Sequence, residues 1–353
     1  MTILSDGNVS TTSNVSNVSN VSTILKNNKE IKEKLNVIIC CSNPCQYASR
    51  YRLAKEFIKR INENNSDDVN LYVIELVYKS QEFHITEKNN PNHLQLKTES
   101  QPMWHKENLL NIGIKKLLPE SWKYVAWIDA DIEFDNAHWA SDTLKLISEI
   151  SDDSDLCTYD IVQLFSHALD MNSQQITMSI FAGFGYQYIH KKPFIHGGNP
   201  NHQWHPGYAW AMNRKAYDKM GGLFEYGILG AGDHHMTLAW IGNGIKSVRE
   251  TDGYKTDGYK TAILNYQEKC KGLKLGYTPG IIRHYYHGSK KKRFYNERWQ
   301  ILLKHNYDPY LHLNKNNQGL LIPSENCPTE LLNDIMNYFK SREEDENEII
   351  KNE

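Results

Sequence analysis

The sequence predicts one large α/β domain, because a strand–helix–strand pattern opens its folded part and further apolar strands follow. The chain has 353 residues, of which 40% are hydrophobic, so it can bury a full core. An apolar run at 35–41 is followed by helical spacing over 50–62 and by a second apolar run at 69–76. This is the pattern of a right-handed βαβ unit, in which the loop after the first strand is a common ligand contact.

A second helix leads into a third apolar strand. Residues 104–118 carry apolar side chains at helical spacing, and Pro119 ends this helix before the apolar run at 124–128. The rest of the domain is predicted from apolar periodicity and turn residues: a helix at 139–150, strands at 161–165 and 176–181, and a loop at 193–205. A repeated pentapeptide at 251–255 and 256–260 is too short for a solenoid and predicts a duplicated surface loop.

The two ends of the chain have a different composition from the domain at 35–340. Residues 1–34 are a low-complexity leader with repeated Asn-Val-Ser, and we expect it to be disordered. These triplets match the glycosylation acceptor pattern, but no secretory signal accompanies them. Residues 341–353 form an acidic tail with few apolar residues, which we expect to be frayed or solvated.

Composition narrows the class of protein. A net charge of -2 gives no general attraction to nucleic acid. Six cysteines show neither a disulfide framework nor paired zinc-ligand spacing. No apolar run reaches the roughly 18 residues of a membrane span, and the start of the chain lacks the features of a signal peptide. We therefore expect a cytoplasmic protein that neither binds nucleic acid nor spans a membrane.

Two carboxylates, Asp129 and Asp131, follow the strand at 124–128 directly. Strand periodicity places them on one side, at the carboxyl end of a buried strand where open α/β sheets bind ligands. Such a pair can hold a divalent cation against a diphosphate. The competing interpretation is turn chemistry, in which Asp bonds the backbone. Apolar residues on both sides favour the metal, because burying two carboxylates without a partner is costly.

Asp233 lies in a second segment of interest, between small residues and an apolar helical stretch that includes Trp240. Its position is that of a helix N-cap, which contributes roughly 1 kcal/mol. At the rim of a ligand site the same carboxylate could accept a proton as a general base. The two roles are compatible, and the sequence leaves both open.

The third segment, at 281–293, contains His284 and His287 and ends in four cationic residues that include Lys290 and Lys291. A neutral imidazole together with carboxylates suits Mn²⁺, and adjacent cations would neutralise a diphosphate. Each feature alone is more often structural, since single histidines pack in cores and basic runs face solvent. All three segments together favour a site.

These motifs resemble those of the metal-dependent glycosyltransferases of the GT-A fold, loosely the β-1,4-galactosyltransferase type, over roughly residues 35–310. Neither Gly-x-Gly-x-x-Gly nor a Walker loop follows the first strand, which argues against dinucleotide and P-loop enzymes. The resemblance implies a Rossmann-like three-layer α/β/α domain with a mixed central sheet. It also implies a nucleoside-diphosphate sugar donor, with a UDP-sugar favoured, and a glycan or protein acceptor.

The resemblance also implies roles for individual residues. Asp131 becomes a ligand of Mn²⁺ or Mg²⁺, and Asp129 contacts the metal, the ribose or the diphosphate. Either His284 or His287 completes the metal site, and Asp233 is the base of an inverting transfer. Candidate donor contacts are Ser42, Asn43, Arg50, Lys106, Asp129, Lys290 and Lys291, and candidate acceptor contacts are Trp204, Trp210 and His234. Packing of at least one of the two tryptophans in the core is an equally good interpretation. The galactosyltransferase type has several acids where this chain has only Asp233 followed by two histidines, so the base and the acceptor stay open.

Two other functions remain possible from the sequence. A metal-dependent nucleotidyltransferase or phosphodiesterase also needs close carboxylates, and Glu133 and Asp135 lie nearby, but neither has a clear partner motif. A non-catalytic carbohydrate-binding protein would explain the 8 Trp and 21 Tyr residues without a metal.

Overall fold

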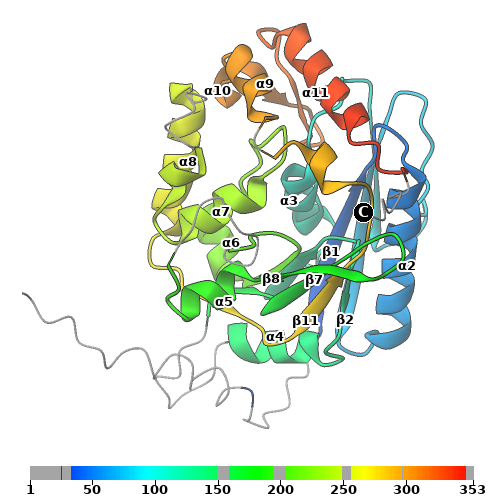
Figure 1. Ribbon diagram of the computed structural model, residues 1–353, viewed down its shortest axis with the longest axis vertical. Coiled ribbons are helices and arrows are strands. Elements are labelled where there is room, and N and C mark those ends of the chain that lie inside the picture. The colour runs from blue at the N-terminus through cyan, green and yellow to red at the C-terminus, as the bar shows by residue number, and fades with distance from the viewer. Residues whose placement is uncertain are drawn as a thin grey trace, which may run out of the picture.

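A computed structural model describes residue 25 and residues 33–148, 159–193, 204–248, 256–295 and 297–346 (Figure 1). Its largest element is a seven-stranded sheet in the order β10-β6-β9-β4-β1-β2-β3. The strands β4, β1, β2 and β3 run parallel, whereas β9 lies antiparallel between β4 and β6. The expected α/β fold with a mixed central sheet is confirmed. The strands of this sheet are β1 (Leu35–Ser42), β2 (Val69–Tyr78), β3 (His93–Thr98), β4 (Tyr124–Ile128), β6 (Ile161–Gln163), β9 (Ala209–Asn213) and β10 (Leu275–Tyr277).

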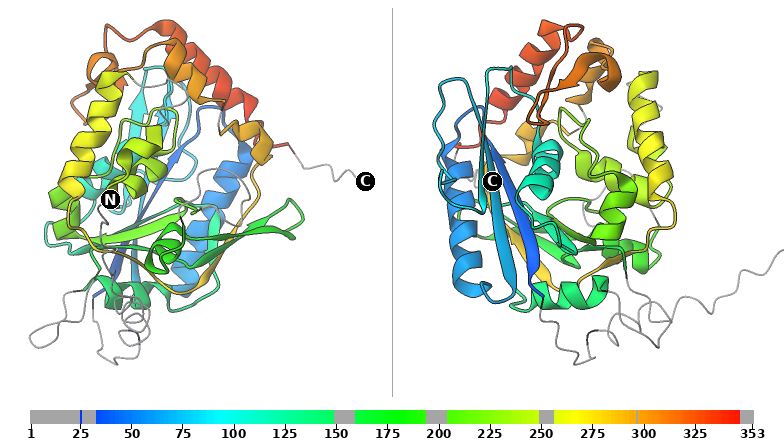
Figure 2. Two further views of the ribbon diagram at one scale, coloured as in Figure 1. Left: turned by 60° about the vertical axis from the view of Figure 1, so that its left-hand side comes forward. Right: turned by 180° about the vertical axis from the view of Figure 1, so that it is seen from behind.

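Side chains of the central strands alternate between two apolar cores, one on each face of the sheet. In β1, Val37 and Ile39 belong to one apolar cluster, while Ile38 between them belongs to the other. Both faces are buried, which explains why these parallel strands are apolar almost throughout. The first cluster includes residues of two helices, α2 (Ala48–Asn64) and α4 (Trp139–Ile147). Helices therefore cover the sheet on both sides, as Figure 2 shows from behind.

The second cluster lies under a larger set of helices: α3 (Lys106–Lys116), α6 (Arg214–Met220), α7 (Gly232–Trp240), α8 (Asp257–Cys270), α9 (Trp299–Lys304) and α11 (Thr329–Ser341). Helix α3 lies very close to the sheet because Gly113 has no side chain. A Cβ there would stand 2.0 Å from the Cδ1 atom of Ile74 and 2.6 Å from that of Ile38. The start of α3 lies at the carboxyl end of β1, where the Cys40 thiol donates to the Lys106 carbonyl at 3.7 Å.

A four-stranded sheet in the order β5-β11-β7-β8 brings together the segments that carry the candidate site. In this sheet, β11 pairs with both β5 and β7, and His284 at its end is the register partner of Ile132 and of Asp170. His284 is thereby placed beside the segment that follows β4. The strands are β5 (Ile132–Phe134), β7 (His167–Met171), β8 (Thr177–Ala182) and β11 (Ile281–His284).

The remaining elements are short, and they lie mainly toward the C-terminus: α5 (Phe184–Ile189), α10 (Pro309–His312), β12 (Leu313–Lys315), β13 (Leu321–Pro323) and two 3₁₀ turns, η2 (Gly244–Val248) and η4 (Lys290–Arg293). None of the described helices is both long and apolar enough to cross a membrane.

The prediction of a solvated acidic tail is wrong for Arg342 and Glu344, whereas Glu343, Asp345 and Glu346 are exposed as expected. Arg342 and Glu344 are buried, with 3% and 1% of their surface exposed. Asp345 caps helix α2, because the backbone N–H groups of Ala48 and Ser49 each donate to its carboxylate at 2.8 Å. The charged residues of this segment predicted a solvated tail, but Glu344 and Asp345 find their partners about 300 positions earlier in the chain.

Three further expectations differ from the structure or cannot be compared with it. The edge strand β3 was not expected, because its polar residues alternate along a half-exposed strand. The second pentapeptide is not a surface loop: Thr256 caps α8, which begins at Asp257. The first pentapeptide, most of the leader and most of the loop at 193–205 lie outside the described residues.

Candidate metal and ligand site

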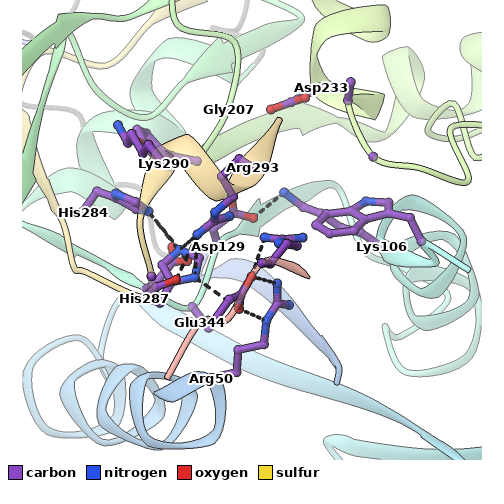
Figure 3. Close-up of a pocket in the computed structure, with 18 of the residues that line it drawn as sticks. Arg50, Lys106, Asp129, Gly207, Asp233, His284, His287, Lys290, Arg293 and Glu344 are labelled. Atoms are coloured by element: carbon purple, nitrogen blue, oxygen red, sulfur yellow. Dashed lines mark hydrogen bonds and ion pairs between the residues drawn. The ribbon is translucent and has the colours of Figure 1, made fainter. Parts of the chain in front are cut away.

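A cavity of about 950 Å³ lies at the carboxyl ends of β1 and β4, where open α/β sheets bind ligands. Its walls come from the loop after β1, the start of α3, residues 128–131, Asp170, the segment 204–208, the start of α7, His284, the segment 286–291, Arg293, Arg298, Arg342 and Glu344. All three segments singled out in the sequence, around Asp131, Asp233 and His284, reach this one cavity (Figure 3).

Three side chains in the cavity have the arrangement of metal ligands. The Oδ2 atom of Asp131 lies 2.9 Å from Nε2 of His287 and 3.8 Å from Nε2 of His284. The two Nε2 atoms are 3.3 Å apart. This is the group with metal-ligand spacing found among the described residues. Both histidines therefore reach the same point, where the sequence had left a choice between them.

The surroundings of Asp131 fit a cation. Its Oδ1 atom is buried and has no hydrogen-bond partner among the described residues. Burial raises the pKa of this carboxyl, but His287 and His284 outweigh that effect and hold it well below its ordinary value. An ionised carboxylate and two imidazoles form a donor set that suits Mn²⁺.

Asp129 is not part of this triad. Its carboxylate forms an ion pair with Lys106 at the start of α3, and its backbone N–H donates to the Tyr208 carbonyl at 2.7 Å. Burial lowers the pKa of Lys106, but Asp129 and the nearby carboxylates of Glu107 and Asp233 outweigh it, so the pKa is raised. Lys106 therefore carries a charge inside the cavity, next to the triad.

Asp233 lies in the first turn of α7 and lines the cavity, but it is not the N-cap. The expected capping role is wrong: the N-cap is Ala231, in the left-handed region with φ 65°. The Asp233 carboxylate accepts from the N–H of His234 at 2.8 Å and packs against Gly207. Because Asp233 does not cap α7, its carboxylate can face the cavity, across from the metal ligands, as Figure 3 shows.

Glu107 is an ionisable group of this cavity that the sequence analysis did not single out. Burial raises its pKa to about 7, with a further contribution from Asp233 and opposition from Lys106. Its carboxyl group packs where a side chain on Gly232 would stand, so the small residues before α7 make room for it. The sequence shows the small residues Gly230 and Gly232 but gives no local sign of the glutamate that packs against them.

The loop after β1 is held by its own hydrogen bonds and by the C-terminal segment. The hydroxyl of Ser42 bonds that of Tyr78 at 2.8 Å, and the Asn43 side chain bonds both backbone groups of Tyr47. Arg50 points to Glu344, with Nη2 at 2.9 Å from Oε1. The predicted donor contacts Ser42, Asn43 and Arg50 therefore line the cavity with these bonds already formed.

The predicted basic residues divide between the cavity and solvent. Lys290 forms a 2.6 Å ion pair with Asp170 and lies over the ring of Phe181. Lys291 also lines the cavity. Lys292 instead pairs with Glu343 and Glu346 on the surface.

Trp210 cannot contact an acceptor sugar, which corrects its predicted role. It is 1% exposed in β9, where its ring packs edge-on against Trp240 and its Nε1–H donates to the Pro206 carbonyl. Trp204 and His234 do line the cavity, and Trp204 packs edge-on against Phe184. The sequence could not separate the two tryptophans, because both follow small or polar neighbours.

Three arginines, Arg293, Arg298 and Arg342, add positive charge to the part of the cavity wall that also includes Glu344. Burial and the like charge of Arg293 lower the pKa of Arg342 to about 9, although Glu344 opposes them. The Nε atoms of Arg293, Arg298 and Arg342 are buried without a hydrogen-bond partner among the described residues. Such donors suit an anionic ligand. No sequence motif marked Arg298, Arg342, Asp170 or Glu344.

The chain was compared with known proteins. No protein-family model matches it, and no curated protein matches it either.

Proposed function

We propose that the protein is a metal-dependent glycosyltransferase of the GT-A type that moves a sugar from a nucleoside-diphosphate donor, with a UDP-sugar favoured, to a hydroxyl of a glycan or protein. One observation carries the proposal: Asp131, His284 and His287 converge at the carboxyl end of β4, in the same cavity as Asp233. This geometry supplies a place for a diphosphate and, opposite it, a carboxylate for the acceptor.

The chain's own residues would divide the work as follows. Asp131, His284 and His287 would hold a divalent cation, Mn²⁺ or Mg²⁺, which when bound stabilises the negative charge on the departing diphosphate. Lys106, Lys290 and Arg293 line the same region and can orient phosphate oxygens. Asp233 would accept the proton of the acceptor hydroxyl.

The reaction balances in a single displacement. The acceptor oxygen forms a bond to the anomeric carbon, the bond from that carbon to the diphosphate oxygen breaks, and the nucleoside diphosphate leaves with both electrons of that bond. The acceptor proton goes to Asp233. Attack from the side opposite the leaving group inverts the configuration at the anomeric carbon.

The alternative nucleotidyltransferase or phosphodiesterase has less support from the structure. A second metal would need further acids, but Glu133 accepts a hydrogen bond from Tyr285 and Asp135 forms a 2.8 Å ion pair with Arg283. Neither belongs to a ligand group among the described residues. A carbohydrate-binding protein without a metal would not explain why Asp131, His284 and His287 converge.

The test is calorimetric titration of UDP, GDP and CMP, each with and without Mn²⁺. The native chain, Asp131→Ala and the control Asp135→Ala, which removes a surface carboxylate four residues away, are compared. We expect one nucleotide to bind only with Mn²⁺, to the native chain and the control but not to Asp131→Ala. Absence of nucleotide binding under every condition would refute the proposal. Nucleoside monophosphate and sugar phosphate as products would favour phosphodiester cleavage over transfer.

A further inference from the structure

We propose that Asp170 and Glu344 are positioning residues of the metal site, each fixing one histidine ligand through its Nδ1 atom. The inference rests on the proposed function, because it presupposes that the triad binds a metal. It assigns a role in this site to the segment at 342–346, which follows the last helix.

The separations within the triad indicate that both histidines must keep their Nε2 atoms pointed at one metal position. Ligand atoms about 2.1 Å from one ion stand roughly 3 to 3.5 Å apart. The separations in the triad are 2.9, 3.3 and 3.8 Å. Both imidazoles thus direct Nε2 inward, which requires Nε2 to be without a proton and Nδ1 to carry it.

Asp170 meets this requirement for His284. The two residues are register partners in the parallel strands β7 and β11, so their side chains lie next to each other. Nδ1 of His284 is 2.7 Å from Oδ1 of Asp170. The other oxygen of Asp170 is 2.6 Å from Nζ of Lys290, which fixes the carboxylate in turn.

Glu344 occupies the corresponding place beside His287. Its Oε2 atom is 3.5 Å from Nδ1 of His287. Arg50 and Arg342 hold the Glu344 carboxylate, with Nη2 atoms at 2.9 and 2.6 Å from Oε1, and its side chain is fully buried (Figure 3). A carboxylate fixed this way can set the ring orientation of its neighbour.

Arg293 also approaches His287 but does not replace Glu344. Its Nη2 atom is 2.9 Å from Nδ1 and 3.0 Å from Nε2, so it lies equally far from both ring nitrogens. The lone pairs of the two nitrogens diverge in the ring plane, and one donor cannot lie along both. Arg293 therefore contributes charge near the ring, whereas Glu344 is the acceptor available for the Nδ1 proton.

The two arrangements have the same order of groups, although the contact is 2.7 Å at His284 and 3.5 Å at His287. Each links a carboxylate, a histidine and the metal position, and each carboxylate is anchored by at least one cation. Removing such a partner typically costs 10- to 100-fold in metal affinity. A carboxylate that served only to neutralise arginines would affect stability and leave metal affinity unchanged.

The experiment measures Mn²⁺ affinity of the full chain by calorimetry without nucleotide, and the visible absorption of bound Co²⁺. The variants are Asp170→Asn and Glu344→Gln, each nearly isosteric. The matched control is Glu343→Gln, which removes the same charge from the adjacent residue, where the side chain is exposed and pairs with Lys292. Circular dichroism and thermal unfolding without metal report folding.

For Asp170→Asn and Glu344→Gln we expect the Kd for Mn²⁺ to rise 10- to 100-fold and the absorption spectrum of bound Co²⁺ to change. For Glu343→Gln we expect the native Kd and the native spectrum. Native affinity in either folded variant overturns the assignment for that residue. Should Glu344→Gln fail to fold, Glu344→Asp decides, because it keeps the charge but withdraws the carboxylate by one methylene. Weaker metal binding by this variant supports the assignment, and native binding overturns it.

Failure of this inference is distinguishable from failure of the proposed function. If the native chain binds Mn²⁺ and Asp131→Ala does not, while both carboxylate variants bind normally, only the inference falls. If the native chain binds neither Mn²⁺ nor Co²⁺, the metal-dependent function falls, and the inference with it. Metal binding that depends on Asp170 and Glu344, without any sugar transfer, would uphold the inference and refute the function.

Discussion

Gly207 and Asp233 are packed so closely that a Cβ atom on Gly207 would stand 2.7 Å from Oδ2 of Asp233. Gly207 lies in the segment 204–208 and Asp233 in the first turn of α7, so two walls of the cavity meet at this contact. This packing contact restricts where the Asp233 carboxylate can lie. It is not a hydrogen bond, so it leaves Oδ2 available to a ligand. The position of the proposed base therefore depends on a residue with no side chain.

Replacing Gly207 with Ala should displace the Asp233 carboxylate and slow sugar transfer. Misplacement by about 1 Å can cost on the order of 100-fold in rate, so we expect kcat to fall at least tenfold while donor binding stays native. Steady-state kinetics and nucleotide calorimetry would measure the two effects. In an Asp233→Asn background the same Gly207→Ala change should add little, and a full additional loss there would contradict the mechanism.

Replacing Lys106 with Met should destabilise the fold, because the largely buried Asp129 carboxyl would lose its ion-pair partner. Breaking such a pair costs up to about 3 kcal/mol for groups that retain some exposure. Urea denaturation of Lys106→Met and of the Lys106→Met/Asp129→Asn double variant would measure this cost. We expect the double variant to be the more stable of the two, and the opposite order would show that Lys106 contributes mainly by packing.

Glu107 should make stability depend on pH. Its pKa rises from an ordinary value of 4.5 to about 7 on folding. Between these values the unfolded chain binds fewer protons than the folded one, so the free energy of unfolding falls as pH rises, by up to about 3 kcal/mol at pH 8. Denaturant titrations of the native chain and Glu107→Gln should show the variant gaining in relative stability from pH 5 to pH 8. A constant difference between them would contradict the raised pKa.

Gly113→Ala should destabilise the protein although alanine favours a helix. Alanine gains up to about 1 kcal/mol in helix propensity, but overpacking a core costs about 1 to 3 kcal/mol. The cost of overpacking should exceed the gain in helix propensity, because the new Cβ would clash with Ile74 and Ile38 where α3 packs on the sheet. Thermal unfolding should show a lower Tm. In an Ile74→Val background, where one of these methyl groups is missing, the effect of Gly113→Ala should shrink or reverse.

The sequence predicted the first βαβ unit and β4 well, because strands buried on both faces are apolar throughout and helix α2 has a clear inner face. It did not predict β3, whose half-exposed residues alternate with polar ones at the edge of the sheet. Apolar patterns report burial against the core. They carry less information where a strand faces solvent on one side.

The candidate site was predicted where a local motif marks it. Asp131, His284 and His287 stand beside strands, and strand ends meet at one edge of a sheet. Asp170 and Glu344 were missed, because each acquires its surroundings only from residues distant in the sequence. Trp210 was assigned to the acceptor because no local pattern distinguishes an aromatic residue that packs in the core from one that faces a cavity.

The bond from Arg50 to Glu344 spans 294 positions, and Asp345 caps a helix that begins at Ala48. During translation, α2 leaves the ribosome with an unneutralised arginine and an uncapped first turn, long before their partners are synthesised. At 5 to 20 residues per second the interval is roughly 15 to 60 seconds. Until residues 342–346 have been synthesised, Arg50 and the first turn of α2 therefore lack the partners that they have in the folded domain.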